Sequence, residues 1–585
     1  MFLIENALRP LHGPRRSHGA CARDGCATAI DAEIRSDVRA ASSCTLRPMP
    51  LVTRRRFIGG SVVSVPLLGT SACQKPKPAA PPVAPRPGAG IEDVLAQALE
   101  SAKKAGATYA DARIVRRRTE RIATREDHVV SVASGETYGI GVRVIADGAW
   151  GFASSPTVTG AAADETARKA VAIARAARPA LKRPVELAPA PVAKGTWRTK
   201  MEVDPFEVPL ADKAEWLLAL WPLVKDVPLV KFASGAVESL GEHKYFASSE
   251  GTLVEQTLVR IWPSFSVTAV DAGQFESRAA EVPPMQAGWE YVTRSPLHED
   301  ARRIAEDAVK KLKSPSVTPG KKDLILAPSN LWLTIHESVG HPTELDRVLG
   351  LEANFAGTSF AQPNNLGKLQ YGSEIVTLYA DKTVPGGLAS CGWDDDGVAT
   401  QRWDLVRNGV LVGFQTTRDQ AGWIGEKASR GTSYAQDHAS VAFQRMPNVS
   451  LAPASKDTSL EDIIAATDDG VLVTGNGSWS IDHQRYNFQF SGQTFHEVKG
   501  GKITRTLRDV AYQSNSLEFW SSCDMIGGEK SWELHGTLWD GKGEPGQSNA
   551  VSHGCPPARF RKVDILNVNA RGKSSSGASR GKDDC

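Results

Sequence analysis

The stretch Ser329-Asn-Leu-Trp-Leu-Thr-Ile-His-Glu-Ser-Val-Gly-His341 decides how this chain of 585 residues is interpreted. Ser329 follows Pro328 and is a good N-cap residue, so the sequence predicts a helix that begins at this serine. At its far end the helix carries two histidines and one glutamate, His336, Glu337 and His341. Side chains of these types at close spacing are typical of a catalytic metal centre.

The two histidines are five residues apart, which is an unusual spacing for ligands on one helix. In the H-E-x-x-H helix of zinc enzymes the histidines are four apart and about 40° around the axis, whereas five residues of α-helix turn about 140°. A regular helix would therefore point the imidazoles to different sides. Gly340 and Pro342 suggest two solutions: Gly340 ends the helix in a left-handed conformation that folds His341 back beside His336, or a single π-type turn brings the rings together.

Around this helix, the region 316–570 has the patterns of a β-rich domain. Short apolar runs with the alternation of strands flank it, and glycine-containing residue pairs separate some of them as tight hairpin turns would. The runs and turn pairs are 323–328, 403–414, 485–490, Asn408-Gly409 and Gly500-Gly501.

The preceding region, 91–315, mixes helical and extended patterns. Apolar residues at helical spacing predict a first helix at 91–102, and Asp147-Gly148 between alternating apolar residues predicts a hairpin at 141–152. The predicted fold class is therefore α+β: an N-terminal α+β domain followed by a β-rich catalytic domain that carries one metal-binding helix. Further helical patterns occur at 164–178, 212–221 and 299–312.

Composition and charge limit the classes of function. With 41% hydrophobic and 23% charged residues, the chain can bury sizeable cores, and its length predicts two or three globular units. Residues 1–56 hold ten arginines and five acidic residues, a net +5, so the overall charge of +3 leaves −2 for the rest. This nearly neutral body gives no support for nucleic-acid binding. No apolar run reaches 18 residues, so we predict no membrane-spanning helix.

Residues 49–73 have the features of an export signal. Arg54-Arg55 with Phe57-Ile58 resembles a twin-arginine (Tat) signal, and a short apolar run with small residues leads to Cys73. The end of the run resembles a lipoprotein processing site, although Thr70 stands where such sites usually have leucine. We therefore expect export to the bacterial periplasm or cell envelope with a lipid anchor on Cys73, and simple cleavage nearby is the alternative.

The segments around this signal predict no folded domain. Residues 74–90 are rich in proline and predict an extended tether. Twin-arginine signals stand near a start codon, so we expect translation to begin at Met49 and residues 1–48 to be an upstream segment outside the translated protein. The tail 571–585 is rich in Ser, Gly and Lys and is predicted to be disordered.

Sequence blocks well outside the helix, together with its motif, resemble a known family. The motif that begins at His336 continues into Glu352-Ala-Asn-Phe-Ala-Gly-Thr-Ser-Phe360, and with it the chain resembles the TldD/PmbA family of zinc metallopeptidases, in the TldD-like branch with H-E-x-x-x-H. The resemblance covers about residues 91–568. Further blocks that resemble the family are Tyr109-Ala-Asp-Ala-Arg, Gly141-Val-Arg-Val, Gly372-Ser-Glu-Ile-Val, Asn408-Gly-Val-Leu and Asp540-Gly-Lys-Gly-Glu-Pro-Gly-Gln.

The resemblance implies one zinc ion per chain, held by His336 and His341, with Glu337 as the general base for the attacking water. The family's third ligand is a cysteine in a Cys-Gly-Lys context, and the matching residue here is Asp540. Two histidines and one carboxylate form an accepted zinc set, and the harder carboxylate would also admit manganese or iron. The alternatives for the third ligand are Cys555, His553 and Cys523.

The resemblance further implies a metallopeptidase that cuts peptides or unfolded polypeptide segments. A partner subunit of the TldD/PmbA type, or a second copy in a homodimer, is expected to cover the catalytic cleft. The alternative is a catalytically inactive envelope binding or assembly lipoprotein that retains the fold. The missing cysteine favours this alternative, whereas the intact His336, Glu337 and His341 oppose it.

Overall fold

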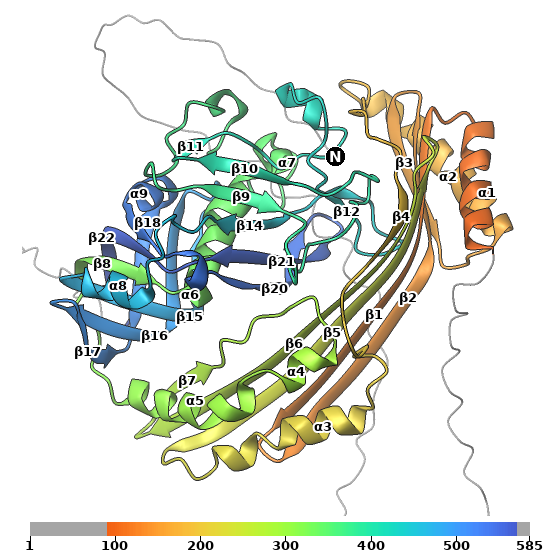
Figure 1. The fold of residues 1–585 in the computed structure, drawn as a ribbon. Coiled ribbons are helices and arrows are strands. Elements are labelled where there is room, and N and C mark those ends of the chain that lie inside the picture. The colour runs from red at the N-terminus through yellow and green to blue at the C-terminus, as the bar shows by residue number, and fades with distance from the viewer. Residues whose placement is uncertain (1–89, 570–585) are drawn as a thin grey trace, which may run out of the picture. The chain divides into compact units, whose positions relative to one another are not determined.

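The computed structural model describes residues 90–569, which contain both predicted regions of the body (Figure 1). The α+β class is confirmed, and helices lie where the first region predicts them. The segments predicted at 1–48, 49–73, 74–89 and 571–585 lie outside the described residues. The helices are α1 (Ile91–Lys104), α2 (Gly160–Ala177), α3 (Leu210–Leu218), α4 (Trp289–Thr293) and α5 (Leu297–Leu312).

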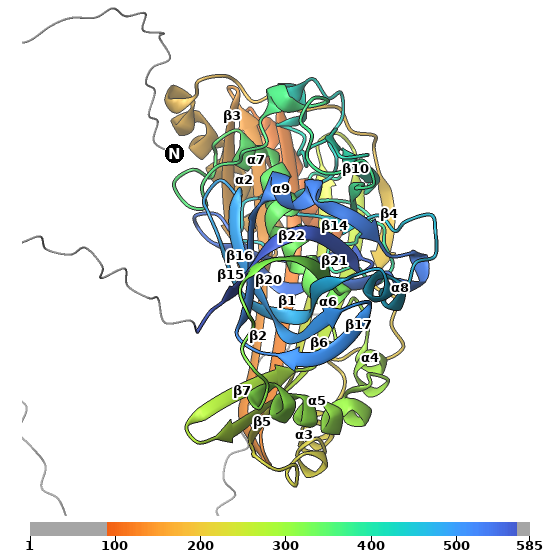
Figure 2. The ribbon, with the colours of Figure 1, turned by 90° about the vertical axis from the view of Figure 1, so that its left-hand side faces the viewer.

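The N-terminal half is built on a seven-stranded sheet in the order β3-β2-β1-β5-β6-β4, with β7 paired to β6. The predicted hairpin is confirmed: Ala146 pairs with Ala149, and the φ angles of 51° at Asp147 and 78° at Gly148 are those of a two-residue turn. The long central strands are seen along their length in Figures 1 and 2. The strands are β1 (Tyr109–Arg125), β2 (His128–Ala146), β3 (Ala149–Ser155), β4 (Lys194–Arg198), β5 (Val230–Ser248), β6 (Leu253–Asp271) and β7 (Gln274–Ala279).

The helices of this half cover the two ends of the sheet. Helices α1 and α2 pack against β1, β2 and β3 through a face of small and branched residues that includes Ala98, Ala167 and Val171. Helix α5 packs on β6 and β7, where Ile304 and Ala305 are buried. The apolar stripe read from the sequence at 91–102 and 299–312 is thus the face that each helix buries.

The C-terminal half contains a second seven-stranded sheet in the order β15-β8-β22-β18-β16-β17. An additional pairing between β15 and β16 closes five of these strands into a ring, and β19 pairs with β22. Aromatic side chains fill its core, among them Phe488, Tyr512 and Phe519. The strands are β8 (Gly320–Leu326), β15 (Asp469–Ile481), β16 (Asn487–Lys499), β17 (Lys502–Leu507), β18 (Val510–Asn515), β19 (Cys523–Ile526) and β22 (Ala558–Asn567).

Helix α6 (Pro328–Ile335) lies beside some of the smaller elements of this half. This helix follows β8 and contacts β14, β15, β20 and β21, so strands from three sheets pack around it. Every residue of α6 is buried. The smaller elements are β9 (Leu378–Asp381), β10 (Arg402–Arg407), β11 (Val410–Leu411), β12 (Ser433–Tyr434), β13 (Phe443–Gln444), β14 (Asn448–Leu451), β20 (Glu533–Lys542), β21 (Gln547–Cys555), α7 (Leu345–Val348), α8 (Leu460–Ala465) and α9 (Ser516–Ser521).

Buried ion pairs connect the first sheet to the C-terminal half. Arg143 on β2 contacts Asp396 at 2.6 Å, and Lys244 on β5 contacts Asp395 at 2.9 Å. All four side chains are at most 7% exposed, so these contacts are shielded from solvent. Within residues 90–569, no helix has the length and apolar character needed to cross a membrane.

Candidate metal centre

The helix that carries the motif changes its geometry at His336. Helix α6 ends at Ile335, residues His336–Gly340 form one π-helical turn, and His341–Thr343 form a 3-10 turn. The wider π turn reduces the rotation per residue, so the two histidines five positions apart face one another. Their ring centroids are 4.7 Å apart. The π turn is therefore the solution that the chain adopts for this spacing.

One detail of the predicted helix, the cap at Ser329, was wrong, and one of the two alternatives for the histidine spacing is excluded. The cap residue is Ala327 with Pro328 at the first helical position, because the hydroxyl of Ser329 instead accepts a hydrogen bond from the backbone N–H of Gly475 at 2.9 Å. Gly340 is not left-handed, since its φ is −56°. Its lack of a side chain serves close packing instead: a Cβ there would lie 2.5 Å from the sulfur of Met446.

Long-range hydrogen bonds hold the π turn in place. The hydroxyl of Ser338 accepts a bond from the indole Nε1–H of Trp520 at 2.9 Å and donates to the carbonyl of Thr334. The hydroxyl of Tyr371 donates to the carbonyl of Ser338. All of these groups are buried, and the bonds from Trp520 and Tyr371 are tertiary contacts that stabilise the non-standard turn.

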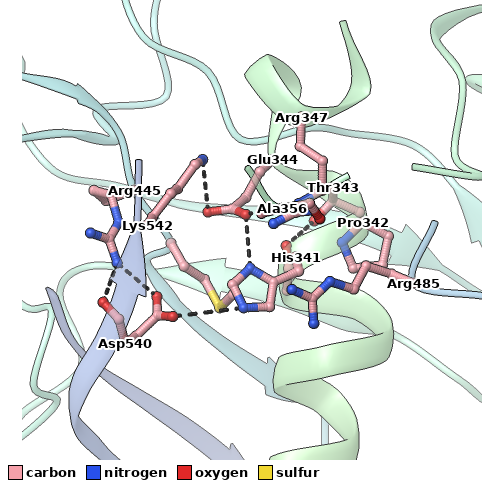
Figure 3. Close-up of polar contacts among 12 residues, drawn as sticks. His341, Pro342, Thr343, Glu344, Arg347, Ala356, Arg445, Arg485, Asp540 and Lys542 are labelled. Atoms are coloured by element: carbon pink, nitrogen blue, oxygen red, sulfur yellow. Dashed lines mark hydrogen bonds and ion pairs between the residues drawn. The ribbon is translucent and has the colours of Figure 1, made fainter. Parts of the chain in front are cut away.

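Asp540 on β20 completes a group of three donors with the histidines. The ligand atoms of His336, His341 and Asp540 all lie within 4.8 Å of one another. Asp540 Oδ1 is 3.7 Å from the Nε2 atom of each histidine, and Figure 3 shows its contact with His341. Two donors that each sit about 2.0–2.2 Å from a zinc ion are separated by roughly this distance, so the residues fit a zinc-sized ion.

The hydrogen bonds of the two imidazoles leave both Nε2 atoms free to bind a metal. His341 Nδ1 lies 2.8 Å from Glu344 Oε2, and a carboxylate can only accept, so Nδ1 carries the proton. His553 Nδ1 lies 2.8 Å from the carbonyl of Val449 and must likewise be protonated. The Nε2 atom of neutral His553 is then an acceptor, and His336 Nδ1 donates to it at 2.8 Å. Both ligand histidines thus present an unprotonated Nε2 to Asp540.

Electrostatics favour the neutral imidazoles that a metal requires. Burial first, and then the positive charge of Arg485, lower the pKa of His336 and of His341 to about 3. Burial also lowers the pKa of His553 well below its usual value. Neutral imidazole is the ligand form, so no proton has to leave these rings near neutral pH.

A buried set of charges surrounds the ligands. The Lys542 ammonium lies 3.2 Å from Glu344 (Figure 3) and 2.8 Å from Asp346. Burial would raise the pKa of Glu344, but Lys542 and His341 outweigh burial and hold it well below the usual range. Glu344 therefore stays ionised and able to accept the proton of His341. Arg445 pairs with Asp540 in the same way, at 3.0 Å from Oδ2.

Glu337, the predicted general base, is paired with an arginine. It forms an ion pair with Arg485, which lies in the link between β15 and β16. Burial raises the pKa of the Glu337 carboxyl, and the charge of Arg485 opposes this effect. The structure thus places a carboxylate with increased proton affinity directly after His336.

The other residues considered for the third ligand do not join the donor group. Cys555 is buried with its sulfur 3.7 Å from the carbonyl of Pro328, and Cys523 lies near the carbonyl of Met525 at 3.9 Å. Burial raises the pKa of both thiols, which disfavours the thiolate that binds metals. His553 is adjacent but supports His336 rather than facing Asp540.

Sequence reasoning missed Arg445 and Arg485. Neither belongs to a motif, and the contacts join residues 95 positions apart for Arg445 and Asp540 and 148 apart for Arg485 and Glu337. A buried carboxylate in a ligand set implies a nearby cation, but the sequence does not say which of the many arginines it is.

A helix that presents two histidines to a carboxylate on a neighbouring strand, with a glutamate directly after the first histidine, is an arrangement that metallopeptidases use. Family models identify the chain directly. The model of PmbA/TldA metallopeptidase domain 1 matches residues 110–174, that of the central domain matches 203–314, and that of the C-terminal domain matches 319–567. The chain belongs to the PmbA/TldD metallopeptidase family.

Similar proteins agree with this membership. A metalloprotease of Methanothermobacter thermautotrophicus is 28% identical over 78% of this chain and 95% of its own length. A zinc metalloprotease TldD homolog of Saccharolobus solfataricus is 21% identical over 80% of this chain and 98% of its own. The crystal structure of TldE from Thermococcus kodakarensis has the same fold, with a TM-score of 0.59 at 17% identity over 81% of this chain and all of that chain (100%).

Proposed function

We propose that this protein is a zinc peptidase that hydrolyses peptides or unfolded polypeptide segments, with Glu337 as the general base. Family membership supports a metal-dependent peptidase, and the zinc, the base and the substrate class are our additions. The observation that carries the proposal is the convergence of His336 Nε2, His341 Nε2 and Asp540 Oδ1 beside a buried glutamate.

His336, His341 and Asp540 would hold the ion, and His553 and Glu344 would fix the tautomer and orientation of the two imidazoles. When bound, zinc supplies a Lewis acid that lowers the pKa of a water molecule toward about 7. Glu337 accepts a proton from the attacking water and later delivers it to the leaving amine. The burial that raises the pKa of Glu337 suits a group that must take up and release one proton in each turnover.

Glu337→Gln tests the role of the base separately from metal binding. The amide keeps the size of the side chain but accepts no proton, so the metal content should match the wild type. Peptide hydrolysis should fall by about a hundred- to ten-thousand-fold, the usual contribution of a general base. Metal content by mass spectrometry and cleavage of a mixed peptide pool measure the two effects. Glu533→Gln, on the same strand as Asp540 but 60% exposed, is the matched control and should leave both unchanged.

Three outcomes of this assay decide between the functions. Equal cleavage by wild type and Glu337→Gln would contradict the role of Glu337. No cleavage by a metal-loaded wild type, with any co-purifying subunit retained, would favour the inactive binding or assembly lipoprotein. Metal-free wild type that cannot be loaded with zinc would contradict the metal centre itself.

We further propose that the protein acts outside the cytoplasm and pairs with a second subunit, either of the TldD/PmbA type or another copy of itself. The supporting features are the twin-arginine and lipoprotein-like sequence at 49–73 and the family membership. Labelled fatty acid should appear on Cys73, and Cys73→Ala should release the protein from membranes. Unchanged membrane attachment of that variant would contradict the lipid anchor.

A further inference from the structure

We propose that Arg445 keeps Asp540 a one-oxygen metal ligand, so that the centre selects ions satisfied by four ligands and prefers zinc to manganese or iron(II). The inference rests on the proposed zinc centre and deepens it by naming the residue that sets the coordination. A carboxylate in place of the family's cysteine would otherwise make the site harder and less selective.

The two oxygens of Asp540 have separate roles in the structure. Oδ1 faces His336 and His341, 3.7 Å from each Nε2 atom. Oδ2 accepts a hydrogen bond from the Arg445 guanidinium at 3.0 Å. The same nitrogen of Arg445 also donates to the backbone carbonyl of Asp540, so the arginine is hydrogen-bonded to both the side chain and the main chain of this residue.

Arg445 is itself rigidly placed. It follows β13, its other terminal nitrogen donates to the carbonyl of Gln547 at 2.9 Å, and its side chain is 1% exposed. Asp540 is the one carboxylate with which it pairs among residues 90–569. A buried cation with a single counter-ion does not readily release that partner, because the release would leave both charges unpaired.

This geometry limits how the carboxylate can bind a metal. A bidentate carboxylate must turn both oxygens toward the ion, whereas Arg445 holds Oδ2 away from the imidazoles. Three donor atoms and one open position are the pattern of four-coordinate catalytic zinc. Manganese and iron(II) favour larger sets with more oxygen ligands. The pair of Asp540 and Arg445 thus offers one donor atom, as a cysteine thiolate does.

The test compares wild type with Arg445→Met in the full chain, using cobalt(II) as a spectroscopic probe and zinc against manganese in competition. Wild type should show the intense visible absorption of four-coordinate cobalt(II). In Arg445→Met, the freed Oδ2 of Asp540 should also bind the ion, so the coordination number should rise and the cobalt absorption should weaken. The preference for zinc over manganese should fall by about tenfold or more.

Arg260→Met is the matched control. Arg260 borders the same small buried cavity as Arg445 and is 2% exposed, but its carboxylate partner is Glu242, at 3.0 Å. Losing this buried ion pair should reduce stability while leaving the cobalt spectrum and the metal preference unchanged. A spectral change in both variants would mean a general loss of structure and would overturn the proposal.

A second pair of variants keeps the test decisive if Arg445→Met folds poorly. Arg445→Lys retains the charge but lacks the second terminal nitrogen, which anchors Arg445 to the carbonyl of Gln547, so a smaller spectral change is expected. In an Asp540→Cys background, which has no second oxygen, replacing Arg445 should not alter the cobalt spectrum. If the wild type binds zinc and the Arg445 variants have the same cobalt spectrum and metal preference as the wild type, this inference is refuted and the proposed function still stands. Wild type that binds no metal would refute both.

Discussion

His553→Phe is expected to weaken metal binding although His553 is not a ligand. The phenyl ring can keep the stacking on Trp332, whose ring centroid lies 5.9 Å away, although phenylalanine is somewhat larger than histidine. The change removes the acceptor that fixes the proton on His336 Nδ1 and the donor to the carbonyl of Val449, both at 2.8 Å.

The magnitude follows from these two lost bonds. Each buried group without a partner costs about 1–3 kcal/mol of the free energy of unfolding. His336 can recover a partner only by moving its proton or its ring, and a proton on Nε2 would occupy the lone pair that faces Asp540. Loss of such a supporting contact weakens metal affinity by about 10–100-fold, which corresponds to about 1.4–2.8 kcal/mol.

The assay is zinc titration against a competing chelator, combined with urea unfolding of the metal-free protein. His535→Phe is the matched control, because His535 pairs with His553 in register across β20 and β21 but, within residues 90–569, its side chain hydrogen-bonds only to Glu533. It should bind zinc as the wild type does. Equal zinc affinity of His553→Phe and wild type would refute the argument that hydrogen bonding to His553 sets the tautomer of His336.

Two further predictions concern stability. Burial alone would raise the pKa of Glu242, but the charges of Arg260 and Lys244 lower it to about 2. The ion pairs of Glu242 therefore stabilise the fold above about pH 4.5, and this stabilisation is lost as the pH falls toward 2. Glu242→Gln should therefore cost roughly 3 kcal/mol at pH 7, and urea unfolding should show the difference from wild type narrowing below pH 4.5; a constant difference would contradict the linkage. Gly340→Ala should reduce the free energy of unfolding by about 1–3 kcal/mol, because the new Cβ would clash with Met446. Adding Met446→Ala should relieve this clash, so the double variant should be less destabilised than the sum of the two single changes. Thermal melts that show strict additivity would exclude the clash.

Several parts of the fold could be predicted from the sequence because their causes are local. The hairpin at Asp147-Gly148 forms because both residues adopt a positive φ, which few other pairs tolerate. The helices at 91–102 and 299–312 follow from an apolar stripe with helical period. The metal motif was equally visible, because two of the three donors and the glutamate lie within one turn of the chain.

The pairing of strands could not be predicted from the sequence. The parallel contact between β8 and β15 and the antiparallel contact between β8 and β22 join segments separated by long stretches of chain. Each apolar run could have paired with several others, and only the packing of the complete core distinguishes them.

The sequence by itself determined the class of site: His336, Glu337 and His341, with Asp540 as the leading choice for the third donor. Only the tertiary structure decided between the two geometries for the five-residue spacing, because the contacts of Ser338 with Trp520 and Tyr371 stabilise the π turn from outside the motif. It also supplied the groups that tune the donors. The contact of His336 with His553 spans 217 residues, and no local pattern encodes which distant side chain will complete a buried hydrogen bond.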